Sequence, residues 1–184
     1  MYFPPRALTH PPAPEEPKMA FGRKAERTQR PARIALVGPA GSGKTMGALI
    51  IMTVLGPKMV GVYDSEVSSS SVYAPAPGER ANPFDKKAPT FDFQVDYPDA
   101  GDNSPDAYID AMRRAWDAGI DGLIVDSLSH AWMGEGGILS MADAKGNRFD
   151  AWKELTPIQQ RLMRAVLTYP SHIICTMRTK TAYE

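Results

Sequence analysis

The sequence is poor in the residues that build disulfides and structural metal sites. Cys175 is the single cysteine among 184 residues, so no disulfide forms within the chain and a cysteine-based zinc cluster is excluded. The three histidines, His10, His130 and His172, lie far apart and lack the spacing of a metal-binding set. The fold therefore has to rest on an apolar core, which the 43% of apolar residues can supply for one ordinary domain.

Long apolar segments are missing as well. No apolar run approaches the roughly 18 residues of a membrane span, and the N-terminus lacks the apolar stretch of a signal peptide. We therefore expect a soluble, intracellular protein without a membrane partner. Basic and acidic residues balance at 21 each, so the bulk charge does not point to nucleic acid. The two ends are nevertheless basic and the middle of the chain is acidic.

The first 32 residues differ in composition from the rest. They hold seven prolines and few periodic apolar residues, which predicts a disordered arm over residues 1–32 and a folded domain over residues 33–184. Basic residues gather near the end of this arm, at Arg23, Lys24, Arg27, Arg30 and Arg33. Such a cluster either contacts a polyanion such as DNA or is a solvated tail, and the second reading is the simpler one.

A glycine-rich stretch organises the folded part. It fits the phosphate-binding pattern G-x-x-x-x-G-K-S/T with Gly38, Pro39, Ala40, Gly41, Ser42, Gly43, Lys44 and Thr45. A short apolar strand over 33–37 precedes it and an apolar helix over 44–55 follows it, which is the context that this loop requires. Backbone N–H groups of the loop and the helix N-terminus attract anions. We expect Lys44 to reach the β- and γ-phosphates of a nucleotide and the Thr45 hydroxyl to bind Mg²⁺.

Strands and helices alternate after this loop. We expect strands over 33–37, 59–64, 90–95, 122–126 and 172–176, and helices over 44–55, 105–118 and 156–168. Ser104 is the expected N-cap of the second helix, in which Trp116 is expected to face the core. The third helix is expected to start at Thr156-Pro157, and residues 129–150 to form a loop with a short helix. The alternation predicts an α/β fold with a parallel sheet.

Polar residues at strand ends are the candidates for chemistry. Asp126 ends a buried strand, a position from which a carboxylate holds Mg²⁺ beside a phosphate-binding loop. Asp64 and Glu66 end another strand, and we expect Glu66 to orient or deprotonate the water that attacks the γ-phosphate. Thr176 is expected to sense the γ-phosphate if its strand neighbours that of Asp126. For Arg178, which follows it, a phosphate contact and a solvated position stay equally open; the same holds for Lys180.

These segments together resemble the RecA-like P-loop ATPase core, in particular the small phage-encoded nucleotide-binding ATPases of the AAA/RecA type. Asp64-Ser65-Glu66 is similar to the D-A-E of that core, in which Glu activates the hydrolytic water. Tyr73 lies where the family places an aromatic residue against adenine. The segment from Leu123 to Ser127 looks like the family's L-I-V-V-D-S strand, and residues 176–180 are similar to its Q-I-R-M-K segment. The resemblance covers about residues 33–180.

The resemblance implies a three-layer α/β/α fold with ATP and Mg²⁺ as ligands. It also implies ATP hydrolysis, with Lys44, Glu66, Asp126 and Thr176 as catalytic residues, and assembly into a homo-oligomer. The implied partner is single-stranded DNA, in phage recombination, annealing or replication in the phage or bacterial host cytoplasm. In that family the loop after the Asp126-type strand contacts DNA, and the candidates here are Trp132, Lys145 and Arg148.

Three departures from the family pattern qualify these expectations. Thr176 stands where RecA has a Gln that couples the nucleotide state to DNA binding. The shorter Thr is expected to transmit such a change less well. The proline-rich arm is no counterpart of the RecA polymerisation domain. The family core continues through further strands, so we expect a truncated or minimal version of it.

A phosphate-binding loop also occurs in three other function classes. A small-molecule P-loop kinase needs an acceptor pocket and a basic lid; no arginine-rich lid is obvious between Asp126 and His172, although Arg161 and Arg164 lie there. A GTPase is expected to carry N-K-x-D, which is absent. A regulatory module that binds nucleotide and hydrolyses little stays open.

Overall fold

The computed structural model describes residues 30–66, 69–87, 89–146 and 149–179. The predicted disordered arm falls mostly on residues 1–29, which lie outside the described residues. The last residues of that predicted arm already belong to the fold. The Ala32 N–H donates to Nδ1 of His172 (3.0 Å), and the Ala32 carbonyl accepts from the N–H of Ile173 (3.0 Å).

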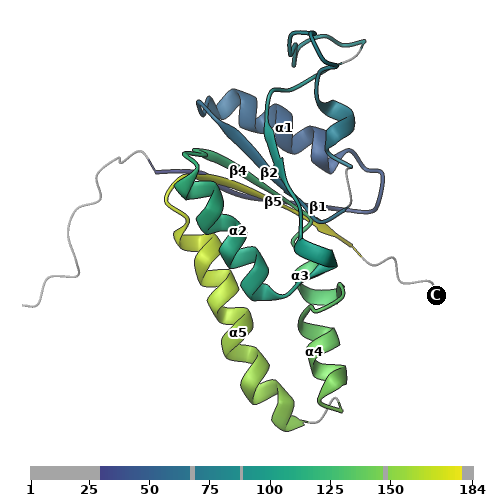
Figure 1. The fold of residues 1–184 in the computed structure, drawn as a ribbon, viewed down its shortest axis with the longest axis vertical. Coiled ribbons are helices and arrows are strands. Elements are labelled where there is room, and N and C mark those ends of the chain that lie inside the picture. The colour runs from purple at the N-terminus through teal and green to yellow at the C-terminus, as the bar shows by residue number, and fades with distance from the viewer. Residues whose placement is uncertain (1–29, 67–68, 88, 147–148, 180–184) are drawn as a thin grey trace, which may run out of the picture.

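Five parallel strands form one sheet in the order β1-β5-β4-β2-β3 (Figure 1). The strands are β1 (Arg33–Gly38), β2 (Val60–Asp64), β3 (Gln94–Asp96), β4 (Gly122–Asp126) and β5 (His172–Arg178). The register pairs Asp64 with Asp126 and Gly38 with Arg178, so these residues all lie at the carboxyl edge of the sheet. The predicted parallel α/β fold is confirmed, and the strand of Thr176 does neighbour that of Asp126.

Helices cover both faces of the sheet (Figure 1). One face carries α1 (Lys44–Leu55), and the other carries α2 (Pro105–Asp117) and α5 (Phe149–Thr168). Two short helices, α3 (His130–Met133) and α4 (Ile138–Ala144), follow β4, and two 3₁₀ turns, η1 (Ser71–Tyr73) and η2 (Asp99–Gly101), lie in the connections. The expected loop with one short helix over 129–150 is therefore wrong, because that segment holds α3, α4 and the start of α5.

The central strand shows why the sheet needs both helical layers. Every residue of β4 is buried. Leu123 and Val125 pack toward α2 and α5, whereas Ile124 packs toward α1. Parallel strands covered on both faces are apolar along their whole length, and each such side chain stabilises the fold by about 2 kcal/mol.

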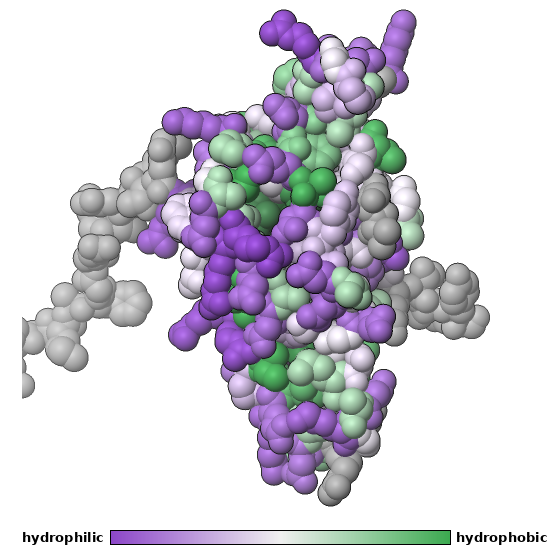
Figure 2. All heavy atoms as spheres, in the orientation of Figure 1, coloured by the Kyte–Doolittle hydropathy of each residue, from purple (hydrophilic) through white to green (hydrophobic). Residues whose placement is uncertain are grey.

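The second helix follows its sequence signals at its start and departs from them at its end. Oγ of Ser104 accepts a hydrogen bond from the N–H of Ala107 (3.3 Å), as expected of an N-cap. Trp116 was expected in the core, but it is 49% exposed. It lies in a surface groove between α2 and α5, with its ring at 81° to that of Tyr169 and the centroids 6.5 Å apart. Hydrophilic residues cover most of the outward surface of α2 in Figure 2.

The long helix α5 starts earlier than its sequence predicts. Thr156-Pro157 was expected to open it, yet it begins at Phe149 and contains Pro157 in its interior. Proline removes one backbone hydrogen bond there. The turns before it are held by packing, because Ala151 and Leu155 are buried against α4. The strand expected over 90–95 is likewise shorter, since the N–H of Phe91 donates to the Tyr73 carbonyl and pairing in β3 starts only at residue 94.

No helix among the described residues combines the length and the apolar character that crossing a bilayer requires.

Candidate nucleotide-binding site

The phosphate-binding loop connects β1 to α1. Gly41 and Gly43 have φ values of 72° and 77°, a left-handed conformation that strains any residue with a side chain. A Cβ on Gly38 would lie 2.8 Å from Oγ of Ser42, so a side chain there would displace the Ser42 hydroxyl. The second and third glycines of the motif are therefore requirements of this backbone.

The first turn of α1 suits an anion. Gly43 at the N-cap has no side chain to accept from the free N–H groups of the helix, and the first turn contains no acidic residue. These N–H groups and the positive end of the helix dipole are consequently left for a ligand such as phosphate. Nζ of Lys44 donates to the Pro39 carbonyl (2.7 Å), which holds the ammonium over the loop. Phosphate is a stronger partner for an ammonium than a neutral carbonyl is.

Asp126 lies beside this loop with two hydroxyl partners. Its carboxylate is 1% exposed. Oγ1 of Thr45 donates to Oδ2 of Asp126 (2.6 Å), and Oγ1 of Thr176 donates to Oδ1. Burial raises the pKa of Asp126, the two hydroxyl groups lower it in part, and the carboxylates of Glu66 and Asp64 raise it further. A cation next to Asp126 would stabilise its ionised form.

The donor set fits Mg²⁺. The Thr45 hydroxyl and the Asp126 carboxylate are hard oxygen ligands, and Mg²⁺ is typically held by one or two such groups together with water and nucleotide phosphates. Within the described residues, no group of three or more His, Cys, Asp or Glu side chains could hold a metal by itself. The site therefore suits an ion that shares its coordination with a nucleotide.

The two acids at the end of β2, Asp64 and Glu66, have different hydrogen-bond partners. Asp64 is fully buried and accepts from the N–H of Glu66 (2.9 Å) and from the N–H and hydroxyl of Ser70 (2.9 and 2.6 Å). Asp64 thus fixes the turn that carries Glu66. The Glu66 carboxylate in turn pairs with Arg178, with 2.7 Å from Nε to Oε1 and 2.6 Å from Nη2 to Oε2.

Two forces act on the charge of Glu66. Burial raises its pKa, but the hydrogen bond and the charge of Arg178 outweigh burial, and His130 and Lys44 act in the same direction as Arg178. The pKa of Glu66 consequently lies below its usual value. Glu66 is ionised and already neutralised by a partner, whereas Asp126 has no cation beside it among the described residues.

Sequence reasoning missed a set of small polar contacts around this site. Oγ of Ser65 donates to the Ser127 carbonyl (3.1 Å) and lies 3.0 Å from Nδ1 of His130, and Oγ of Ser129 accepts from the N–H of Arg178 (2.8 Å). These bonds join the ends of β2, β4 and β5. No motif could have indicated them, because the partners are brought together by strand order alone.

Other predicted residues lie elsewhere or outside the described chain. Tyr73 is half-buried against the core beneath α1, and its contact with adenine stays a prediction. Trp132, a candidate for DNA contact, packs against Trp152 with centroids 6.0 Å apart and is half-buried. Lys145 is paired with Glu154. Lys180 and Arg148 lie outside the described residues.

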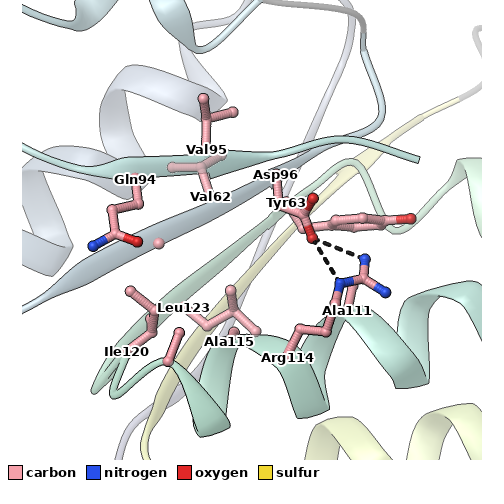
Figure 3. Close-up of a pocket in the computed structure, with 12 residues that line it drawn as sticks. Val62, Tyr63, Gln94, Val95, Asp96, Ala111, Arg114, Ala115, Ile120 and Leu123 are labelled. Carbon is pink, nitrogen blue, oxygen red and sulfur yellow. Dashed lines mark hydrogen bonds and ion pairs between the residues drawn. The ribbon is translucent and has the colours of Figure 1, made fainter. Parts of the chain in front are cut away.

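A cavity away from the loop contains none of the predicted site residues. Figure 3 shows this cavity of about 290 Å³ between β2, β3 and α2, where Asp96 of β3 pairs with Arg114 of α2 (2.8 Å). Its walls are otherwise mainly apolar, with Val62, Ala111 and Leu123 among them. The chemistry of the site is therefore to be sought at the carboxyl edge of the sheet and not in this cavity.

A comparison with models of known protein families identifies the family of this chain. A family model described as an AAA domain matches residues 30–184. No curated protein matches the sequence. The matched region includes the phosphate-binding loop, and the family indicates nucleotide binding. The chain therefore belongs to the AAA domain family of P-loop nucleotide-binding proteins.

Proposed function

We propose that the protein binds ATP with Mg²⁺ and hydrolyses it in the manner of a RecA-like ATPase. The observation that carries this proposal is that Thr45 and Thr176 both donate to Asp126 beside the N-terminus of α1, which has no side-chain cap. The ionised Glu66 follows the end of the neighbouring strand β2. The loop and Lys44 bind the phosphates, and Thr45 and Asp126 hold the metal. Mg²⁺, when bound, neutralises charge on the β- and γ-phosphate oxygens.

Glu66 is the proposed base. It orients a water molecule and takes its proton while the water oxygen forms a bond to the γ-phosphorus. The bond between that phosphorus and the bridging oxygen of ADP breaks, so the products are ADP and inorganic phosphate. Thr176 senses the γ-phosphate through Asp126, to which its hydroxyl is bonded.

The finer proposal is that this activity serves phage-type recombination, annealing or replication on single-stranded DNA, with the chain acting as a homo-oligomer. It is supported by the resemblance of the segments at 64–66, 123–127 and 176–180 to the RecA core. The predicted DNA-contacting segment supports it less, because Trp132 and Lys145 both have partners within the chain. DNA stimulation therefore has to be measured separately from hydrolysis.

The test is phosphate release from ATP, with and without Mg²⁺ and with and without single-stranded DNA. Glu66→Gln should keep ATP binding and lose turnover by about 10²-fold or more. Lys44→Ala should lose binding as well. Glu79→Gln, which changes an exposed acid in the loop after η1, is the matched control and should behave as wild type. Tight ATP binding without turnover in the wild type would overturn hydrolysis and favour a regulatory module.

One observation favours a second candidate, phosphoryl transfer to a small molecule. A cavity of about 470 Å³ lies next to Asp64 and Ser65, with Tyr97 and Glu135 in its walls. Crevices at the carboxyl ends of parallel strands are where ligands bind in such sheets. The predicted lid residue Arg161 is paired with Asp106 (2.6 Å), which weakens this candidate. ADP formation that requires an added acceptor and releases no phosphate would establish it.

A further inference from the structure

The pair of Glu66 and Arg178 joins two strand ends that are 112 residues apart in the sequence. Both carboxylate oxygens are bonded to one guanidinium, at 2.7 and 2.6 Å, in the parallel two-bond geometry that gives the strongest pairs of this kind. The Glu66 side chain is 15% exposed and that of Arg178 is 40% exposed. A carboxylate that is held in this way has one lone pair of each oxygen occupied and is a weaker base toward a water molecule.

Arg178 is anchored beside the phosphate-binding loop. Its backbone pairs with Gly38, the first residue of the loop, and the N–H of Thr179 donates to the Gly38 carbonyl (3.2 Å). The backbone N–H of Arg178 donates to Oγ of Ser129 (2.8 Å). The Cα of Arg178 is thus fixed, while the guanidinium at the end of its long side chain is only half enclosed.

The pair also lies within electrostatic reach of the phosphate-binding lysine. Lys44 is among the groups that lower the pKa of Glu66. Because Arg178 is the strand partner of Gly38 at the start of the loop, an anion bound by the loop and Lys44 would also attract the guanidinium that neutralises Glu66. A phosphate group carries more negative charge than a carboxylate and competes for arginine.

We propose that Arg178 is the positioning residue for Glu66, which it holds when no γ-phosphate is bound and releases when the γ-phosphate of ATP takes over its guanidinium. The inference rests on the proposed function, because it assigns Glu66 as the base. The freed carboxylate can then accept a water proton, which a carboxylate paired to arginine does poorly. ADP lacks the competing group, so the pair persists in the ADP state.

The test is a double-mutant cycle on nucleotide affinity. A non-hydrolysable ATP analogue and ADP, each with Mg²⁺, are titrated into wild type, Glu66→Gln, Arg178→Gln and the double variant. The neutral amide of Glu66→Gln binds arginine less tightly, so affinity for the analogue should rise about fivefold while affinity for ADP stays the same. Arg178→Gln should lower the affinity for the analogue about tenfold and leave that for ADP unchanged.

The double variant separates the proposed exchange from simple charge repulsion. If Glu66 weakens analogue binding only by its negative charge, Glu66→Gln gives the same gain with and without Arg178. Under the proposal, the gain disappears in the Arg178→Gln background. Equal gains in both backgrounds, or equal loss of analogue and ADP affinity in Arg178→Gln, would overturn it. Arg178→Lys, which keeps the charge without the two-bond geometry, should lie between wild type and Arg178→Gln.

The outcome also distinguishes this inference from the proposed function. A wild type that releases no phosphate but shows the coupling would retain the exchange and lose hydrolysis. A wild type that hydrolyses ATP without the coupling would retain hydrolysis and lose the exchange.

Discussion

Two carboxylates at the carboxyl ends of neighbouring strands are held in opposite ways. Asp126 at the end of β4 is almost completely buried, accepts from two hydroxyl groups, and has a raised pKa because burial dominates. Glu66, just beyond β2, is bound by a guanidinium and has a lowered pKa although burial acts against this. Among the described residues, Asp126 has no ion-pair partner, whereas Glu66 is paired with Arg178.

The difference indicates how two nearby acids can take different roles. A buried carboxylate with hydroxyl partners lowers its electrostatic cost when a metal ion arrives. A carboxylate with an arginine partner gains nothing from a second cation, and its ability to accept a proton depends on how firmly that arginine is held. This difference supports the proposal that the metal binds on the β4 side and the attacking water on the β2 side.

The change with the largest expected effect is Asp126→Asn, which removes the metal-binding charge and keeps the shape. Turnover should fall on the order of 10³-fold, because charge stabilisation of the reacting phosphate is lost. The melting temperature should stay equal to that of wild type or rise, since an ionised group no longer has to be buried. Phosphate release and a thermal melt at neutral pH measure both. Turnover within tenfold of wild type would remove Asp126 from the metal site.

Thr45→Val sharpens the metal side of the comparison. It deletes the hydroxyl that donates to Asp126 and is proposed to bind the metal, at nearly constant volume. We expect turnover to fall about 10²-fold, and Thr45→Ser, which keeps the hydroxyl, to retain most of it. A titration of turnover against Mg²⁺ concentration distinguishes the two variants. If both variants need the same Mg²⁺ concentration as wild type, Thr45 is no ligand.

Thr176→Val tests the opposite side of the Asp126 carboxylate. Thr176 is fully buried, so its loss leaves Oδ1 of Asp126 without its hydroxyl partner. The free energy of unfolding should fall by about 1–2 kcal/mol, as measured by urea denaturation. Turnover should fall about tenfold, and Thr176→Ser should restore both. Unchanged stability in Thr176→Val would show that this hydrogen bond contributes nothing.

The smallest expected effect is a shift in pH dependence on the Glu66 side. Arg178 is the main group that lowers the pKa of Glu66, with His130 and Lys44 contributing less. In Arg178→Gln this main lowering contribution is lost, so the pKa of Glu66 should rise. Because the ionised carboxylate is the active form, the acid limb of kcat/KM should move to higher pH. Profiles of both proteins, with Glu66→Gln as the control that lacks this limb, provide the measurement. A limb at unchanged pH would contradict the assignment of Glu66 as the base.

Features encoded by neighbours in the sequence could be predicted closely. The bounds of α1 and β4 are those expected, and Ser104 caps α2 as its position suggests. Features set by distant packing could not. The first turns of α5 depend on contacts of Leu155 with α4, and the exposure of Trp116 depends on how α2 packs beside α5.

The sequence by itself determined the phosphate-binding loop, because left-handed glycines and a lysine at fixed spacing are local requirements of that turn. It also determined the parallel α/β class, through the alternation of apolar strands and helices. Only the tertiary structure decided which side chain meets which acid. Because β5 pairs between β1 and β4, Thr176 reaches Asp126 and Arg178 reaches Glu66, although the partners are 50 and 112 residues apart. Strand order is a property of the whole sheet, and no local pattern in the chain encodes it.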